Sequence, residues 1–169
     1  DKYIVVGSSA TLSQEYRILN ADNPDGKFKI FQERVNGLEY SISHFKDKWY
    51  ITTNKDGATN FKLMNCPENK TNSKNWKEYV PHRDDVLLEG VEVFNDFLVL
   101  TERENGLRRV DIRPWSGKGR HYINFEEEAY SLYSSANPEM NTSKFRYSYS
   151  SMTTPNSVVE YDMISKDMK

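Results

Sequence analysis

Serine and histidine are the residues of this chain whose types could support hydrolysis by a covalent mechanism. A strongly activated serine often sits in a Gly-x-Ser-x-Gly turn, and the sequence contains no such pentapeptide. The closest approach, Gly7–Ala10, lacks the second glycine. His44, His82 and His121 fall in different parts of the chain, and none has a serine and an acid at an interpretable spacing. We therefore expect these 169 residues to contain no catalytic residue.

Adjacent carboxylates are the second candidate for chemistry. They occur as Asp84-Asp85 and as the run Glu126–Glu128. Paired carboxylates support acid and base catalysis when one pKa is raised. Both groups fall in polar connections between expected strands, so solvated loops are the simpler interpretation and catalysis is the alternative.

A third set of side chains suits contacts with another domain. These candidates are His82, Arg83, Asp84, Asp85, Arg103, Arg108 and Arg109. The first four form one run between two repeats, where a hydrogen-bonded corner is the favoured interpretation and an ion-paired domain contact is the alternative. The three later arginines have the same two interpretations, because a guanidinium pairs with carboxylates in bidentate fashion at interfaces.

Composition argues against several partners. The net charge is −2, and the 23 basic and 25 acidic residues are spread along the chain. A surface for nucleic acid or anionic membrane needs a clustered basic face instead. The single cysteine, Cys66, provides neither a disulfide nor a cysteine-rich metal site. We expect no cofactor, no metal, no nucleic-acid partner and no membrane partner.

A recurring strand with a leading aromatic residue organises the whole chain. Tyr3, Trp49, Phe97 and Phe145 each follow a short polar stretch, at successive spacings of 46, 48 and 48 residues. A period of that size, with four short strands in each copy, is typical of propeller blades. We predict an all-β fold, a partial β-propeller of about three and a half four-stranded antiparallel blades. A β-sandwich or β-meander is the alternative.

Turn residues divide the repeats into blade fragments at about 1–34, 35–81, 86–125 and 128–169. The first fragment lacks an opening strand, and the last ends before a fourth strand. Phe97–Leu100 is apolar at every position, which predicts a strand buried on both faces. Gly90 predicts a bulge, Asn105-Gly106 predicts a turn, and 120–125 is expected to form the fourth strand of its blade.

Several runs, in order, resemble the propeller domain of the oligopeptidase B (protease II) branch of the prolyl oligopeptidase family of serine peptidases. They extend from about Tyr3 to Met163 and are specific only when taken together. The runs are Thr52–Asp56, Asn60–Met64, Pro81–Gly90, Thr101–Leu107 and Tyr147–Pro155.

The resemblance implies a seven-bladed propeller with an open seam, placed over a C-terminal α/β-hydrolase domain with a Ser-Asp-His triad. In such enzymes the propeller limits substrates to short peptides, and the hydrolase domain cleaves after Arg or Lys. This chain matches only the later blades. We therefore expect a non-catalytic propeller fragment of a serine endopeptidase. Its expected partners are the remaining blades, the hydrolase domain and peptide substrates. Its expected location is the cytoplasm or periplasm of a bacterium, as a soluble protein.

Two further expectations follow from this interpretation. Some of the loop carboxylates would line an acidic funnel that concentrates cationic peptides. Incomplete blades at the two ends would leave unpaired strand edges and apolar faces, so the isolated fragment is expected to self-associate. The alternative functions are a stand-alone propeller-like interaction module and a glycan-binding β domain, the latter suggested only by the abundant Tyr and Trp.

Overall fold

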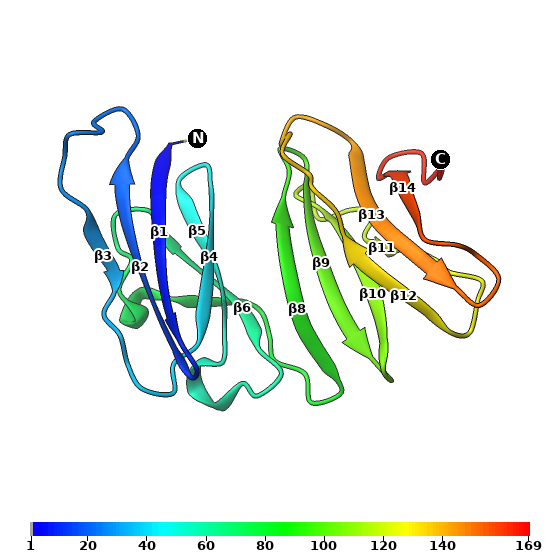
Figure 1. Cartoon of the computed structure of the whole chain (residues 1–169). Coiled ribbons are helices and arrows are strands. Elements are labelled where there is room, and N and C mark those ends of the chain that lie inside the picture. Colours follow the sequence, from blue (N-terminus) through cyan, green and yellow to red (C-terminus); the bar gives the residue numbers. More distant parts are fainter. Residues whose placement is uncertain (1) are drawn as a thin grey trace. The chain divides into compact units, whose positions relative to one another are not determined.

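Strands account for almost all of the regular structure (Figure 1). The computed structural model describes residues 2–169. The described chain forms two compact units, the first ending at Asp84 and the second beginning at Asp85, and each unit contains two antiparallel sheets. No helix within residues 2–169 is long and apolar enough to cross a membrane.

The first unit contains a three-stranded sheet followed by a four-stranded sheet, and each is a meander in which consecutive strands pair. Two short 3-10 turns interrupt the second sheet's connections. The elements are β1 (Tyr3–Ala10), β2 (Ser13–Asn20), β3 (Lys29–Gln32), β4 (Tyr40–Phe45), β5 (Lys48–Thr53), η1 (Lys55–Gly57), β6 (Lys62–Pro67), η2 (Ser73–Asn75) and β7 (Lys77–Val80).

Aromatic residues join the two sheets of the first unit. Trp49 of β5 is completely buried, and its ring lies 5.2 Å from that of Phe31 on β3, measured between centroids. The ring of Tyr40 lies 5.3 Å from that of Trp76, and its hydroxyl donates to the carbonyl of Gln32 at 3.0 Å. Large aromatic side chains therefore contribute much of the apolar burial that holds the first sheet on the second.

The second unit has the reverse order, a four-stranded sheet followed by a three-stranded one. Consecutive strands again pair in antiparallel fashion. The strands are β8 (Val86–Val93), β9 (Phe97–Glu104), β10 (Leu107–Pro114), β11 (His121–Tyr122), β12 (Tyr130–Ser134), β13 (Lys144–Ser151) and β14 (Ser157–Asp162).

The apolar strand β9 lies in the core of the second unit. Phe97 and Val99 are buried in one cluster with Phe145 and Tyr147 of the neighbouring sheet, and Leu98 and Leu100 are also fully buried. The prediction that Phe97–Leu100 is buried on both faces is therefore confirmed, since successive residues of a strand point to opposite faces.

Two local predictions are also confirmed. The hairpin between β9 and β10 turns at Asn105 and Gly106, whose φ angles of 50° and 83° are the positive pair that a two-residue type I′ turn requires. The register between β8 and β9 shifts between Leu88 and Gly90, so a bulge lies at Glu89.

The all-β partial propeller is confirmed, and the terminal sheets have three strands each. Two details differ from expectation. The fourth strand of the third sheet comprises only His121 and Tyr122, because the chain then leaves the sheet and Phe125 packs against Tyr130. After β14 the chain also turns back, and Met168 forms an isolated bridge with Tyr161.

Candidate functional site

The bulge between β8 and β9 places a carboxylate between two of the candidate arginines. In the two-residue hairpin, Arg103 of β9 lies opposite Arg108 of β10. The carboxylate of Glu89 accepts from Arg103 Nε at 2.8 Å and from Arg108 Nε at 2.6 Å. Because a bulge redirects the side chain of its extra residue, this local irregularity brings the acid to both guanidinium groups.

Arg108 also connects the two sheets of the second unit. Its Nη1 donates to the carbonyl of Leu132 on β12 at 3.0 Å, and its guanidinium lies 4.1 Å from the ring centroid of Tyr133. In return, the hydroxyl of Tyr130 donates to the backbone carbonyl of Arg108 at 2.7 Å. The group formed by Glu89, Arg103 and Arg108 therefore connects the four-stranded sheet of the second unit to its three-stranded sheet.

The electrostatics of this group favour its charged form. Burial alone would raise the pKa of Glu89, but the hydrogen bonds from Arg108 and Arg103 lower it below its ordinary value. The hydrogen bond to Glu89 raises the pKa of Arg108. All three side chains remain partly exposed, so the ion pairs are open to water and contribute modestly to stability.

Arg109 lies in a separate contact. Its guanidinium forms an ion pair with Glu104 and lies 4.0 Å from the ring centroid of Tyr122. The structure therefore brings Arg103 and Arg108 together and places Arg109 apart from them. All three arginines have partners within their own unit.

The run from His82 to Asp84 forms a hydrogen-bonded corner. His82 Nε2 accepts from the backbone N–H of Asn60 at 3.1 Å. The side-chain amide of Asn60 donates to the carbonyls of Arg83 at 3.2 Å and Asp84 at 2.7 Å. The Asp84 and Asp85 residues are exposed. These hydrogen bonds connect the segment that follows β7 to the loop that precedes β6.

The three histidines have separate surroundings. Nε2 of His44 contacts a carboxylate oxygen of Glu68 at 3.2 Å, and burial lowers the pKa of His44. His121 Nε2 lies 2.9 Å from the hydroxyl of Tyr161. Within residues 2–169, none of the histidine rings is hydrogen-bonded to a serine hydroxyl, and no group of three His, Cys, Asp or Glu side chains could hold a metal ion.

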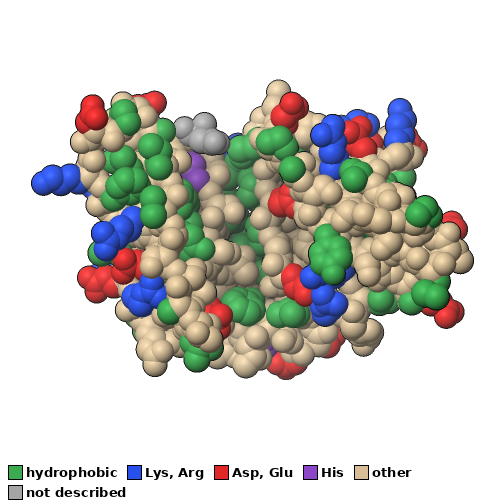
Figure 2. Space-filling view, viewed as in Figure 1, with side chains coloured by type: hydrophobic (Ala, Val, Ile, Leu, Met, Phe, Trp, Pro, Cys, Tyr) green, Lys and Arg blue, Asp and Glu red, His purple; other side chains and the backbone are tan. Residues whose placement is uncertain are grey.

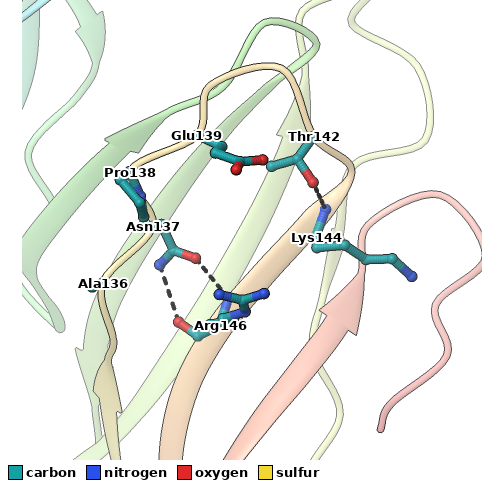
Figure 3. Close-up of a pocket in the computed structure, with 7 residues that line it drawn as sticks. All are labelled: Ala136, Asn137, Pro138, Glu139, Thr142, Lys144 and Arg146. Atoms are coloured by element: carbon teal, nitrogen blue, oxygen red, sulfur yellow. Dashed lines mark hydrogen bonds between the residues drawn. The ribbon is translucent and has the colours of Figure 1, made fainter.

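A small polar pocket lies beside the start of β13 (Figure 3). The side-chain amide of Asn137 donates to the carbonyl of Arg146 at 3.1 Å and accepts from its N–H at 2.8 Å, so Asn137 continues the pairing beyond β12. Lys144 and Arg146 are paired with Asp162 and Glu160 respectively. The cavity, about 100 Å³, is below the roughly 300 Å³ at which small-molecule sites begin.

Two carboxylates with distinctive surroundings were absent from the sequence-based candidates. Glu92 accepts hydrogen bonds from Ser134 and from Asn137, and burial raises its pKa. Asp111 is completely buried and accepts from Arg113 and Arg120. The sequence gives no signal for the burial of Asp111, because an acid between Val110 and Ile112 fits a strand with one face in water equally well.

Comparison with known proteins gives a consistent answer. The family described as "Prolyl oligopeptidase, N-terminal beta-propeller domain" matches residues 1–169. Dipeptidyl aminopeptidase BI of Pseudoxanthomonas mexicana is 44% identical over 160 residues, which are 95% of this chain and 22% of that protein. Protease 2 of Moraxella lacunata is 30% identical over 91% of this chain and 22% of its own length.

The fold comparison agrees with the sequence comparison. Oligopeptidase B from Leishmania major superposes with a TM-score of 0.88 at 25% identity, covering 99% of this chain and 25% of that structure. The chain therefore spans about a quarter of the length of the relatives it matches. With its sheets of three, four, four and three strands, the chain belongs to the N-terminal β-propeller domain family of the prolyl oligopeptidases.

Proposed function

We propose that this chain is the non-catalytic propeller portion of an oligopeptidase B-like serine endopeptidase. The observation that carries the proposal is the match of the whole chain to the family's propeller, at about a quarter of the relatives' length. In the parent enzyme the blades would cover a hydrolase active site and restrict access to short peptides. The hydrolase domain would supply the triad and cleave after Arg or Lys.

The charge of the substrate is the part of this proposal that can be tested most sharply. A site that hydrogen-bonds and neutralises a guanidinium discriminates strongly against a neutral isostere, because its own polar groups are then left unpaired. Some exposed carboxylates of this chain, such as Asp84 and Asp85, would add a favourable field for cationic peptides.

The experiment uses the full-length protein encoded around these 169 residues, compared with the chain alone. We expect the full-length protein to cleave an unstructured decapeptide after an internal arginine, with kcat/KM lower by about a thousandfold or more when citrulline replaces that arginine. The chain alone should cleave neither peptide. Release of N-terminal dipeptides regardless of charge would contradict the endopeptidase proposal. A reading frame that ended near Lys169 would favour the interaction module instead.

The seven candidate interface side chains retain a proposed role in the parent enzyme. Arg103, Arg108 and Arg109 keep between a fifth and two fifths of their side-chain surface exposed while paired. Asp84 is fully exposed at its side chain. We propose that these groups contact the hydrolase domain at their exposed edges, since Arg and carboxylates form bidentate pairs there.

We also propose that the isolated chain self-associates through its first sheet. Hydrophobic side chains gather over that sheet in Figure 2, and Ile4, Val6 and Ile30 are between 41% and 48% exposed. β1 is an edge strand of its sheet, and an apolar edge of this length is a template for pairing with another chain.

Sedimentation measures this association directly. We expect the chain to form dimers or larger species as its concentration rises into the range of about 100 μM, and the variant Ile4→Lys/Val6→Lys to remain a monomer. Met152→Lys is the matched control, because Met152 is 93% exposed in a loop of the second unit. A monomeric wild-type chain at the highest concentration would contradict the proposal.

A further inference from the structure

A cavity in the second unit lies between the chain that follows β11 and residues of β13 and β14. Its volume is about 390 Å³, and it lies among Phe125, Glu126, Glu127, Tyr147 and Tyr149. That volume falls in the range of roughly 300–1,000 Å³ that is typical of small-molecule sites. The cavity is separate from the arginine groups described above, and neither the fold nor the proposed peptidase function requires it.

The aromatic rings of the cavity are held in fixed relative positions. Phe125 and Tyr149 are stacked with an interplanar angle of 9° and a centroid separation of 5.4 Å. Tyr147 meets Phe125 at 89° and 5.8 Å. Tyr130 packs 4.7 Å from Phe125, and its hydroxyl is bound to the backbone of Arg108. Aromatic faces carry partial negative charge, so a group of rings attracts cations.

A carboxylate is fixed at the same cavity. One oxygen of Glu127 accepts from the hydroxyl of Thr153 at 3.1 Å, and the other accepts from the hydroxyl of Thr154 at 2.9 Å. Hydrogen bonds from the hydroxyls of Ser151, Thr154 and Thr153 lower the pKa of Glu127. The hydroxyl of Tyr149 also hydrogen-bonds to this carboxylate. These bonds favour the ionised form, so Glu127 places a negative charge at the cavity.

A second carboxylate adds to the negative field. Glu126 also lines the cavity, its residue is exposed, and it accepts no hydrogen bond from any residue in the range 2–169. A neutral apolar ligand would have to remove water from two carboxylates without replacing their hydrogen bonds, which is unfavourable. An anion would be repelled by both. The combination of ring faces and carboxylates therefore selects an organic cation.

We propose that this cavity binds the guanidinium group of an arginine side chain in a peptide. The guanidinium would lie against the open side of the stacked Phe125–Tyr149 pair, with its charge beside the carboxylates of Glu127 and Glu126. Its planar shape suits both contacts at once, because it stacks on aromatic rings and pairs with a carboxylate in fork geometry. The site is independent of hydrolysis, so it is tested by binding.

The experiment titrates the full 169-residue chain with Nα-acetyl-arginine methylamide and, separately, with the citrulline analogue. Binding is followed by the ¹H–¹³C NMR signals of the aromatic rings. We expect the arginine probe to shift the signals of Phe125, Tyr147 and Tyr149 with a dissociation constant of about 1 mM, an affinity reachable with one stacking contact and one ion pair. The citrulline probe should bind at least about tenfold more weakly, a loss typical of removing a charge-assisted contact.

Two variants and a control locate the site. Glu127→Gln should weaken the arginine probe about tenfold, in line with the loss of a negative charge beside the guanidinium. Tyr149→Leu should also weaken it, whereas Tyr149→Phe keeps the ring face and should retain most of the affinity. Glu128→Gln removes an equal charge from the same run and should leave binding unchanged, since Glu128 does not line the cavity.

Several results would overturn the proposal. Equal binding of the arginine and citrulline probes would show that charge is not recognised. Shifts that persist unchanged in both Glu127→Gln and Tyr149→Leu would place the probe elsewhere. The same titration of the full-length protein should reproduce the shifts, and their absence would show that other residues of the parent occupy the cavity. None of these results affects cleavage after arginine, so the peptidase proposal is judged separately.

Discussion

Replacing Trp49 with alanine is expected to lower the free energy of unfolding of the first unit by about 4 kcal/mol, in the range observed for large aromatic truncations in cores. Trp49 is completely buried. Its ring lies 5.2 Å from Phe31 on the neighbouring sheet, 5.0 Å from Tyr3 and 4.8 Å from His44. The truncation therefore leaves a cavity at the contact between the two sheets. Urea denaturation followed by circular dichroism measures the loss.

Two further variants test the cause of that loss. The indole N–H of Trp49 has no hydrogen-bond partner within residues 2–169, so Trp49→Phe removes volume without breaking a hydrogen bond and should cost only about 1–2 kcal/mol. Phe28→Ala truncates a ring that is 42% exposed and should cost less than about 1 kcal/mol. A similar cost for Phe28→Ala and Trp49→Ala would contradict the proposed role of the aromatic core.

Removing both arginines that hold Asp111 is expected to destabilise the second unit by about 3 kcal/mol, because a buried carboxylate then loses its compensating charges. Asp111 is completely buried. It accepts from Arg113 Nε at 2.7 Å and from Arg120 Nη2 at 2.9 Å. The double variant Arg113→Ala/Arg120→Ala is compared with wild type by urea denaturation.

The triple variant separates the buried charge from the lost packing. Adding Asp111→Ala to the double variant removes the uncompensated carboxylate and should recover part of the lost stability, of the order of 1 kcal/mol or more. A triple variant that is less stable than the double variant would contradict this explanation. Lys118→Ala is the surface control, since Lys118 is exposed and should have little effect.

The repeat and the hairpins could be predicted from the sequence because their signals are local. The spacing of Tyr3, Trp49, Phe97 and Phe145 indicates the sheets, and the Asn105-Gly106 turn sets the β9–β10 register. A two-residue turn places Arg103 opposite Arg108, and like charges opposite one another are unfavourable unless an acid lies between them. The identity of that acid, Glu89, could not be predicted, because it depends on how the bulge at Glu89 directs its own side chain.

The cavity around Phe125 could not be predicted for a related reason. The sequence favoured a strand over 120–125, and a strand there would have kept the ring of Phe125 in its own sheet. Instead β11 ends at Tyr122 and the chain crosses toward β12, so that Phe125 stacks on Tyr149. The β-propensity of the local sequence does not determine where a short outer strand ends, because the end depends on packing against the next sheet. The sequence shows Glu126 and Glu127 as part of an acidic run, but it does not show which aromatic rings and hydroxyl groups surround them in the fold.

We propose that the catalytic nucleophile of the parent enzyme lies outside these 169 residues, and that this chain covers it. Labelling the full-length protein with a fluorophosphonate, followed by mass spectrometry of its peptides, tests this most directly. We expect one labelled serine, within a Gly-x-Ser-x-Gly sequence beyond Lys169, and no label on the chain alone. A labelled serine within residues 1–169 would contradict the claim.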